Sequence, residues 1–149
     1  MSTANLTALQ FHRLLVKAAD DSVLVDLVAE PIEACEPPTY FSLNGMAIRH
    51  DTRRELLAAK LCALLGRAEL RDLWDTSVVL DLGEDLSVGC EDAKRKDGEF
   101  SALTLAWILE TSNVSREARG AGMPAGDAEA LTAFLARLRG NLLTLARPE

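Results

Sequence analysis

The spacing of apolar residues changes near residue 50 of the chain. Before that point, short apolar runs alternate with turn-forming residues, and the run SVLVDLVA (22–29) is rich in β-branched side chains. Short apolar runs bounded by acidic residues and proline are typical of buried strands. The preceding LQFHRLLVKA (9–18) fits a strand or a short helix. We predict a strand that pairs with 22–29 through a turn at Asp20-Asp21-Ser22.

A second hairpin is predicted just before the spacing changes. The run YFSLNGMAIRH (40–50) places Asn44-Gly45 between two short apolar stretches. Asn-Gly favours a two-residue turn because both turn residues take positive φ. The connector between the two hairpins, residues 30–38, carries three Glu and three Pro, and we predict that it is exposed.

After residue 50 the apolar residues recur with helical spacing. Thr52 and Glu55 form the pattern T-x-x-E of a capping box, which opens a helix to about Leu65 that Gly66 ends. Three more helices are predicted over 69–82, from Asp85 to about Gly98, and from Ser101 over SALTLAWILE. Residues 113–126 are predicted to be a loop, and Asp127 to cap a last helix. That helix has the one-sided apolar spacing of a core helix, at Leu131, Phe134, Leu135, Leu138 and Leu142.

These elements predict an α+β fold. Residues 1–50 would form a small β-hairpin sheet, and residues 51–149 a helical bundle of about five helices. The length of 149 residues suits one compact domain that buries its own core.

The composition is that of a soluble globular protein, with 48% hydrophobic and 26% charged residues. A net charge of −7 argues against general attraction to nucleic acid or to an anionic membrane, although it leaves room for a local basic site. We find no signal-peptide pattern and no window of about 18 uncharged apolar residues, so we expect a cytoplasmic protein without a transmembrane helix. Cys35, Cys62 and Cys90 are odd in number and widely spaced, which predicts free thiols in a reducing compartment.

Asp26 interrupts the apolar run VLVDLV, so it has apolar neighbours on whichever face it lies. A buried carboxylate costs several kcal/mol, in order-of-magnitude terms, unless it is paired or binds a cation. Two interpretations remain open from the pattern. Asp26 lies on a solvent-facing side of the sheet, or it is a metal ligand at the rim of the sheet.

Charged residues are also dense in KLCALLGRAELRDLWD (60–75). Lys60 shares a helical stripe with leucines and alanines, so it either extends its ammonium to the edge of the helix or faces a site that needs a cation. The charges that follow it fit a solvated helix face held by weak pairs. They also fit a nucleotide site, in which Lys and Arg bind phosphate and a carboxylate holds magnesium or positions a hydroxyl. The members of this charged set are Lys60, Arg67, Glu69, Arg71, Asp72 and Asp75. A further basic cluster, AKRKDG (93–98), fits favourable placement at a helix C-terminus.

Three segments together resemble the AbiEii/AbiGii-type nucleotidyltransferase toxin family. They are FHRLLVKAADDSVLVDLVAEPIEACEPP, ELLAAKLCALLGRAELRDLWDTSVVL and EDAKRKDGEFSALTLAWIL, within about residues 11–110. The spacing K-L-x-A-L-x-x-R-x-x-x-R-D-x-x-D, preceded by the VDLV strand, is the most specific part of the resemblance. The resemblance implies a polymerase-β-like nucleotidyltransferase core, of which the predicted sheet would be a part, followed by helices. It also implies a bacterial toxin of type IV toxin–antitoxin and abortive-infection systems.

The resemblance implies roles for individual residues. Asp26 corresponds to the third carboxylate of the metal site, and Lys60 to the lysine that binds the triphosphate. Arg67 and Arg71 correspond to further nucleotide-binding positions, and the catalytic positions would be Asp26, Asp72 and Asp75. The expected ligands are Mg²⁺ and a nucleoside triphosphate (NTP), from which a nucleoside monophosphate (NMP) is transferred, with tRNA as an acceptor for some related toxins.

The sequence departs from the family at its start. Family members carry a Gly-Gly or Gly-Ser turn and a hydrophobic-Asp-x-Asp strand that supplies the first two metal carboxylates, and nothing of that kind precedes Asp26. Because two-metal transfer needs those carboxylates, we expect the chain alone to be inactive or nearly so.

Three functions therefore compete. The chain is an incomplete nucleotidyltransferase toxin, a non-catalytic homologue that binds a nucleotide or a cognate antitoxin, or an unrelated structural α+β domain. Open strand edges also predict a homodimer, and no membrane partner is expected.

Overall fold

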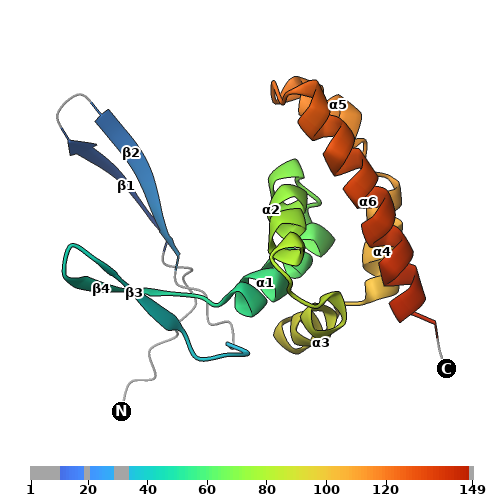
Figure 1. Cartoon of the computed structure of the whole chain (residues 1–149), viewed down its shortest axis with the longest axis horizontal. Helices are drawn as coiled ribbons and strands as arrows, with labels where there is room; N and C mark the ends of the chain where they lie inside the picture. The colour runs from blue at the N-terminus through green and yellow to red at the C-terminus, as the bar shows by residue number, and fades with distance from the viewer. Residues whose placement is uncertain (1–10, 19–20, 29–33, 148–149) are drawn as a thin grey trace, which may run out of the picture. The chain divides into compact units, whose positions relative to one another are not determined.

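The structure is a computed structural model, and it describes residues 11–18, 21–28 and 34–147. It divides into two compact units, residues 1–33 and 34–149. The elements in chain order are β1 (Phe11–Ala18), β2 (Asp21–Val28), β3 (Thr39–Leu43), β4 (Met46–His50), α1 (Arg53–Gly66), α2 (Leu70–Asp81), α3 (Leu86–Lys96), α4 (Ala102–Glu110), α5 (Val114–Gly120) and α6 (Ala125–Leu145) (Figure 1). The predicted α+β class is confirmed.

The first unit is the predicted hairpin, in which β1 and β2 pair antiparallel with Arg13 opposite Asp26. The predicted turn is shifted, because Asp21 and Ser22 already belong to β2; its remaining residue, Asp20, lies outside the described residues. Apolar side chains on both strands are about half exposed, including Leu15 at 55% and Leu24 at 61%. A two-stranded hairpin is only marginally stable by itself, so this surface needs a cover.

The second hairpin, β3–β4, closes on the turn that the Asn-Gly pair predicts. Asn44 has φ 51° and Gly45 has φ 79°, as a type I′ turn requires. The four strands thus form two separate two-stranded sheets.

The helix boundaries follow the predicted caps, with instructive exceptions. The hydroxyl of Thr52 accepts the backbone N–H of Glu55 at 3.1 Å, as expected for a capping box. Gly66, however, lies inside α1, and the chain reverses at Ala68, which has φ 48°. A non-glycine residue in this region costs about 1 kcal/mol, so the turn between α1 and α2 is held by other contacts.

The loop predicted for residues 113–126 is wrong. The side chain of Asn113 accepts the backbone N–H of Arg116 and caps the short helix α5. Seven residues are too few to show a helical period, so the pattern did not reveal this helix. Asp127 is not the cap of α6 either, because α6 begins at Ala125 after Pro124, and Asp127 lies in its first turn.

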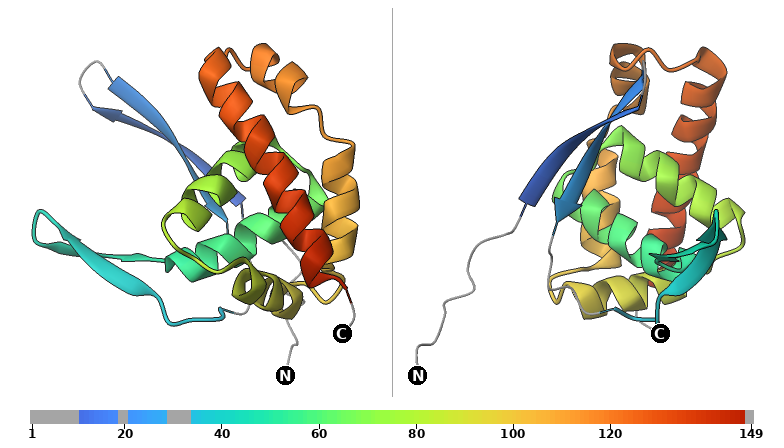
Figure 2. Two further views of the ribbon diagram at one scale, coloured as in Figure 1. Left: turned by 45° about the vertical axis from the view of Figure 1, so that its right-hand side comes forward. Right: turned by 90° about the vertical axis from the view of Figure 1, so that its left-hand side faces the viewer.

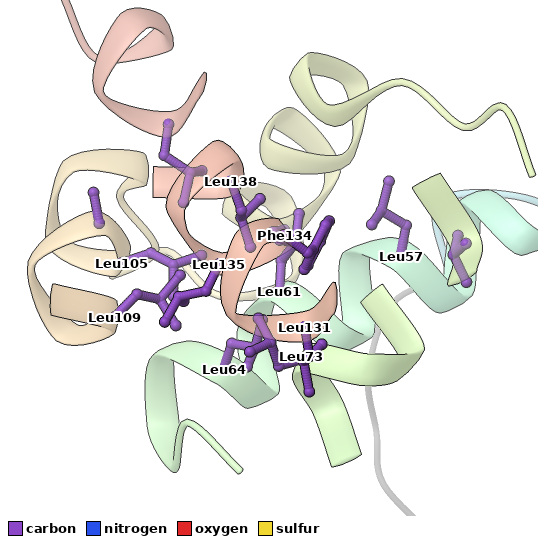
Figure 3. Packing of buried hydrophobic residues seen from close by; sticks show 14 of the residues in the cluster. Leu57, Leu61, Leu64, Leu73, Leu105, Leu109, Leu131, Phe134, Leu135 and Leu138 are labelled. Atoms are coloured by element: carbon purple, nitrogen blue, oxygen red, sulfur yellow. The ribbon is translucent and has the colours of Figure 1, made fainter. Parts of the chain in front are cut away.

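The core lies among the six helices of the described residues. Helix α1 packs against α2 and α3, and α6 packs against α4 and α5 (Figure 2). Figure 3 shows leucines of α1, α4 and α6 converging on one another. The five apolar residues predicted for the core face of the last helix are all buried. Gly89 permits the close approach of α3 to α1, since a Cβ there would lie 2.6 Å from Leu57 Cδ2.

Candidate functional site: the corner between α1 and α2

Two cations of the stretch 60–75 converge on one buried carboxylate. Asp72, in the first turn of α2, has no exposed side-chain surface. Lys60 Nζ, from α1, donates to Asp72 Oδ1 at 3.0 Å and lies 2.6 Å from Asp75 Oδ2. The side chain of Lys60 is 18% exposed. Lys60 therefore does not simply extend into solvent, as one interpretation of the sequence had it.

Arg67 holds the same carboxylate from the other side. It is the C-cap residue of α1, and its Nε and Nη2 donate to the two oxygens of Asp72 at 2.7 and 3.1 Å. The left-handed residue Ala68 follows at once and turns the chain into α2. Asp72 thus accepts three charge-assisted hydrogen bonds, which tie the turn between the helices to its centre.

The hydrogen bonds of this corner favour the charged forms of Asp72 and Lys60. Burial alone would raise the pKa of Asp72, but the hydrogen bonds from Arg67 and Lys60 outweigh it, and the pKa lies below its usual value. Burial would lower the pKa of Lys60, but its bonds to Asp75 and Asp72 leave it raised. The carboxylates and the cations stabilise each other's charged forms.

The corner does not contain Arg71. Its side chain is 71% exposed, and its nearest charged contact is Glu69 at 3.9 Å. Arg71 lines a pocket on another face of α2, together with Trp74. The structure therefore brings together four of the sequence-predicted site residues, namely Lys60, Arg67, Asp72 and Asp75.

Asp26 belongs to the first unit, and the corner belongs to the second. Its carboxylate accepts Nε and Nη2 of Arg13 at 2.7 and 2.9 Å, across the strand pair. The hydrogen bond from Arg13 lowers the pKa of Asp26. The side chain is 42% exposed, so this carboxylate is an exposed, paired group.

The described residues do not by themselves fit a magnesium ion. Within residues 11–18, 21–28 and 34–147, no group of three or more His, Cys, Asp or Glu side chains is placed to hold a metal. Asp26 is paired with Arg13, and Asp72 and Asp75 are paired with Lys60. The metal role of Asp26 stays a prediction.

The comparison with known families decides the identity of the chain. The model of the nucleotidyl transferase AbiEii toxin, type IV toxin–antitoxin system, matches residues 7–144. The chain belongs to the AbiEii family. No curated protein and no solved structure matches it. Among the described residues of this AbiEii-family chain, no helix has the length and hydropathy needed to cross a bilayer.

A second charged network of the AbiEii-family chain was missed in the sequence. The carboxylate of Glu55 is buried and accepts the backbone N–H groups of Cys35 and Glu36 at 2.8 and 3.3 Å. It also pairs with Lys96 of α3, whose side chain is 5% exposed. Burial alone would raise the pKa of Glu55, but the bonds from Lys96 and Cys35 leave it lowered.

Beside that pair, Arg54 Nε donates to Asp92 Oδ2 at 2.5 Å. The side chain of Asp92 is 2% exposed, and Arg95 lies 3.4 Å from its other oxygen. The network ties Cys35 and Glu36, at the start of the second unit, to α1 and α3. The only signal in the sequence was the cluster AKRKDG, which we interpreted as a favourable charge at a helix end. That interpretation is correct for the last turn of α3. Two of its cations also pair with buried carboxylates, Arg95 with Asp92 and Lys96 with Glu55.

Proposed function

We propose that the corner between α1 and α2 binds the phosphates of an NTP and that the chain is the nucleotide-binding part of an AbiEii-type toxin that transfers NMP, with tRNA as the acceptor. The AbiEii family is one of nucleotidyltransferase toxins, which supports the class of reaction. The observation that carries the proposal is the convergence of Lys60 and Arg67 on the buried carboxylate of Asp72. A fixed carboxylate orients both cations, as a preorganised phosphate site requires.

The two cations keep capacity for a phosphate. An ammonium group has three N–H donors, and Lys60 uses two of them on Asp72 and Asp75. The side chain of Arg67 is 49% exposed, and the N–H groups on its Nη1 are not used on Asp72. Phosphate oxygens would therefore be bound without breaking the contacts to Asp72.

The charge of the corner sets a limit on affinity. Lys60 and Arg67 carry two positive charges, and Asp72 and Asp75 carry two negative charges, so the four side chains sum to zero. A triphosphate therefore gains little electrostatic binding energy from these four side chains unless another cation accompanies it. We propose that the NTP binds as its magnesium complex, with the ion held by the phosphates.

We also propose that the chain is inactive by itself. Asp26 is held by Arg13, and the described residues place no three metal ligands together. The same observations favour a second candidate function, a non-catalytic homologue that binds a nucleotide or a cognate antitoxin. Transfer of radiolabelled NMP from an NTP to tRNA by the chain alone would contradict the proposed inactivity, because only an active transferase labels the RNA.

Nucleotide binding is tested by calorimetric titration of the chain with ATP and GTP in the presence of magnesium. Wild type is expected to bind at least one of them, and Lys60→Ala to weaken binding about tenfold or more, since one charge-assisted contact to phosphate is lost. Lys94→Ala, at an exposed lysine of α3, is the matched control and should bind like wild type. Absence of binding by wild type, or equal binding by Lys60→Ala, would remove the nucleotide-site proposal.

The first hairpin provides the surface for the proposed homodimer. Its half-exposed apolar side chains, and outer strand edges that pair with no other strand among the described residues, favour association with a second copy. Sedimentation equilibrium is expected to show a dimer that Leu24→Lys weakens. A strictly monomeric wild-type chain at high concentration would contradict this.

A further inference from the structure

A pocket of about 580 Å³ lies on the face of α2 that carries Arg71. Its apolar lining comes from Leu70 and Trp74 of α2 and from Met123 and Pro124 before α6. All of these residues belong to the second unit. The volume lies in the range of small-molecule sites, which are mostly apolar with a few polar groups at the rim.

The wall opposite α2 is fixed by the end of α5. Gly122 has φ 69°, and the backbone N–H of Met123 donates to the carbonyl of Ala118 at 2.9 Å. The N–H of Gly122 donates to Arg119 at 3.2 Å, which completes a Schellman motif. The position of Met123 is therefore set by the backbone of the turn.

Trp74 gives the pocket an aromatic surface. Trp74 is 38% exposed. It lies beside the apolar residues that line the pocket. An exposed indole in an apolar pocket is suited to stacking with a planar ring such as a nucleobase.

The polar rim narrows the class of ligand. The carboxylates of Glu69 and Asp127 can accept hydrogen bonds from N–H groups, and the guanidinium of Arg71 can donate to an anion. A planar ring that carries N–H donors and is joined to a phosphate matches both the carboxylate acceptors and the guanidinium donor. We propose that this pocket binds a nucleobase, with Trp74 as the stacking residue and Glu69 and Asp127 as acceptors for its N–H groups.

The pocket and the corner share one helix. Trp74 precedes Asp75, which contacts Lys60, and Arg71 stands one turn before Asp75. A nucleotide whose base stacks on Trp74 would direct its phosphate past Arg71 toward Lys60. To that extent the proposal rests on the proposed function and deepens it. It assigns base recognition to Trp74, Asp127 and Glu69, the last of which lies 3.7 Å from Arg67 of the corner.

Nucleosides test the pocket separately, because they lack the phosphate that the corner would bind. The chain has two tryptophans, so Trp107→Phe leaves Trp74 as the only indole reporter. Adenosine, guanosine and cytidine should quench its fluorescence with saturation at millimolar concentrations, and uridine, which lacks an exocyclic amine, more weakly. The matched control is Trp74→Phe, in which the 60% exposed Trp107 remains and only non-saturating collisional quenching is expected.

Two further variants keep the outcomes distinguishable. Lys60→Ala, made in the Trp107→Phe background, should retain nucleoside binding while its triphosphate binding weakens about tenfold or more. Asp127→Asn should weaken adenosine and cytidine binding several-fold. Absence of saturable quenching of Trp74, or equal quenching in both single-tryptophan variants, would overturn the proposal whatever the triphosphate result. Loss of nucleoside binding in Lys60→Ala would also overturn it, since the base would then bind at the corner.

Discussion

Replacing Asp72 by Asn should destabilise the protein through the lost charge and one lost hydrogen-bond acceptor, because the two side chains have nearly the same shape. Removing one partner of a buried ion pair typically costs about 3–5 kcal/mol, since the remaining charge stays buried. Here the partners are only partly buried, with Lys60 18% and Arg67 49% exposed, so both regain water. We therefore expect a loss of about 2–3 kcal/mol, or roughly 5–10 °C in melting temperature for a chain of this size.

The pH dependence identifies the cause. The folded-state pKa of Asp72 lies below its ordinary value of 3.8, so the ionised carboxylate contributes stability that is fully present above about pH 5. That contribution is lost as the pH falls through the lowered pKa. The difference between wild type and Asp72→Asn should therefore be complete at about pH 7 and shrink below about pH 4.

Urea unfolding followed by circular dichroism at several pH values measures this difference. Asp81→Asn, at an exposed position of the same helix, is the control and should stay within about 0.5 kcal/mol of wild type. A loss below about 0.5 kcal/mol for Asp72→Asn, or a loss that does not depend on pH, would refute the electrostatic account of the corner.

Two further predictions concern packing and thiol chemistry. Gly89→Ala should destabilise the protein by about 1–3 kcal/mol in urea unfolding, because its Cβ would collide with Leu57. The control Gly140→Ala, in α6 with nothing within 4 Å of the new Cβ, should instead stabilise by about 0.5–1 kcal/mol; equal effects would contradict the close approach of α1 and α3. Burial raises the pKa of the Cys62 and Cys90 thiols to about 11, so at pH 8 roughly one thiol in a thousand is ionised. Site-resolved alkylation by iodoacetamide should be slow at pH 8 and rise about tenfold per pH unit, whereas fast, pH-independent labelling would be inconsistent with burial.

The local signals in the sequence were reliable where one residue type determines one conformation. Asn44-Gly45 predicted a turn with two positive φ values, and Thr52, Asp85 and Ser101 predicted three helix starts that the structure has. The chain reversal at Ala68 had no such signal, because alanine is an ordinary helix residue. It depends on contacts that form only when α1 and α2 pack.

The composition of the site was predictable in part. The spacing of charges in 60–75 predicted a cluster, and within it Lys60 and Arg67 contact Asp72 while Asp75 contacts Lys60. The separation of Arg71 from that cluster depends on the rotation of α2 about its axis, which tertiary packing decides. Glu55 pairs with Lys96, and Asp92 pairs with Arg54. The partners in each pair are about 40 positions apart, and no local sequence pattern predicts contacts over that separation.

The most direct test of the central claim is the affinity of Asp75→Asn for magnesium-bound ATP or GTP. Asp75 is 36% exposed and pairs with Lys60, so its neutralisation should leave the fold intact, release one donor of Lys60 and give the corner a net charge of about +1. If the corner binds phosphate, calorimetry should show tighter binding than wild type by about three- to tenfold. Unchanged or weaker binding by a folded Asp75→Asn chain would contradict the account and leave the corner as a structural ion-pair cluster.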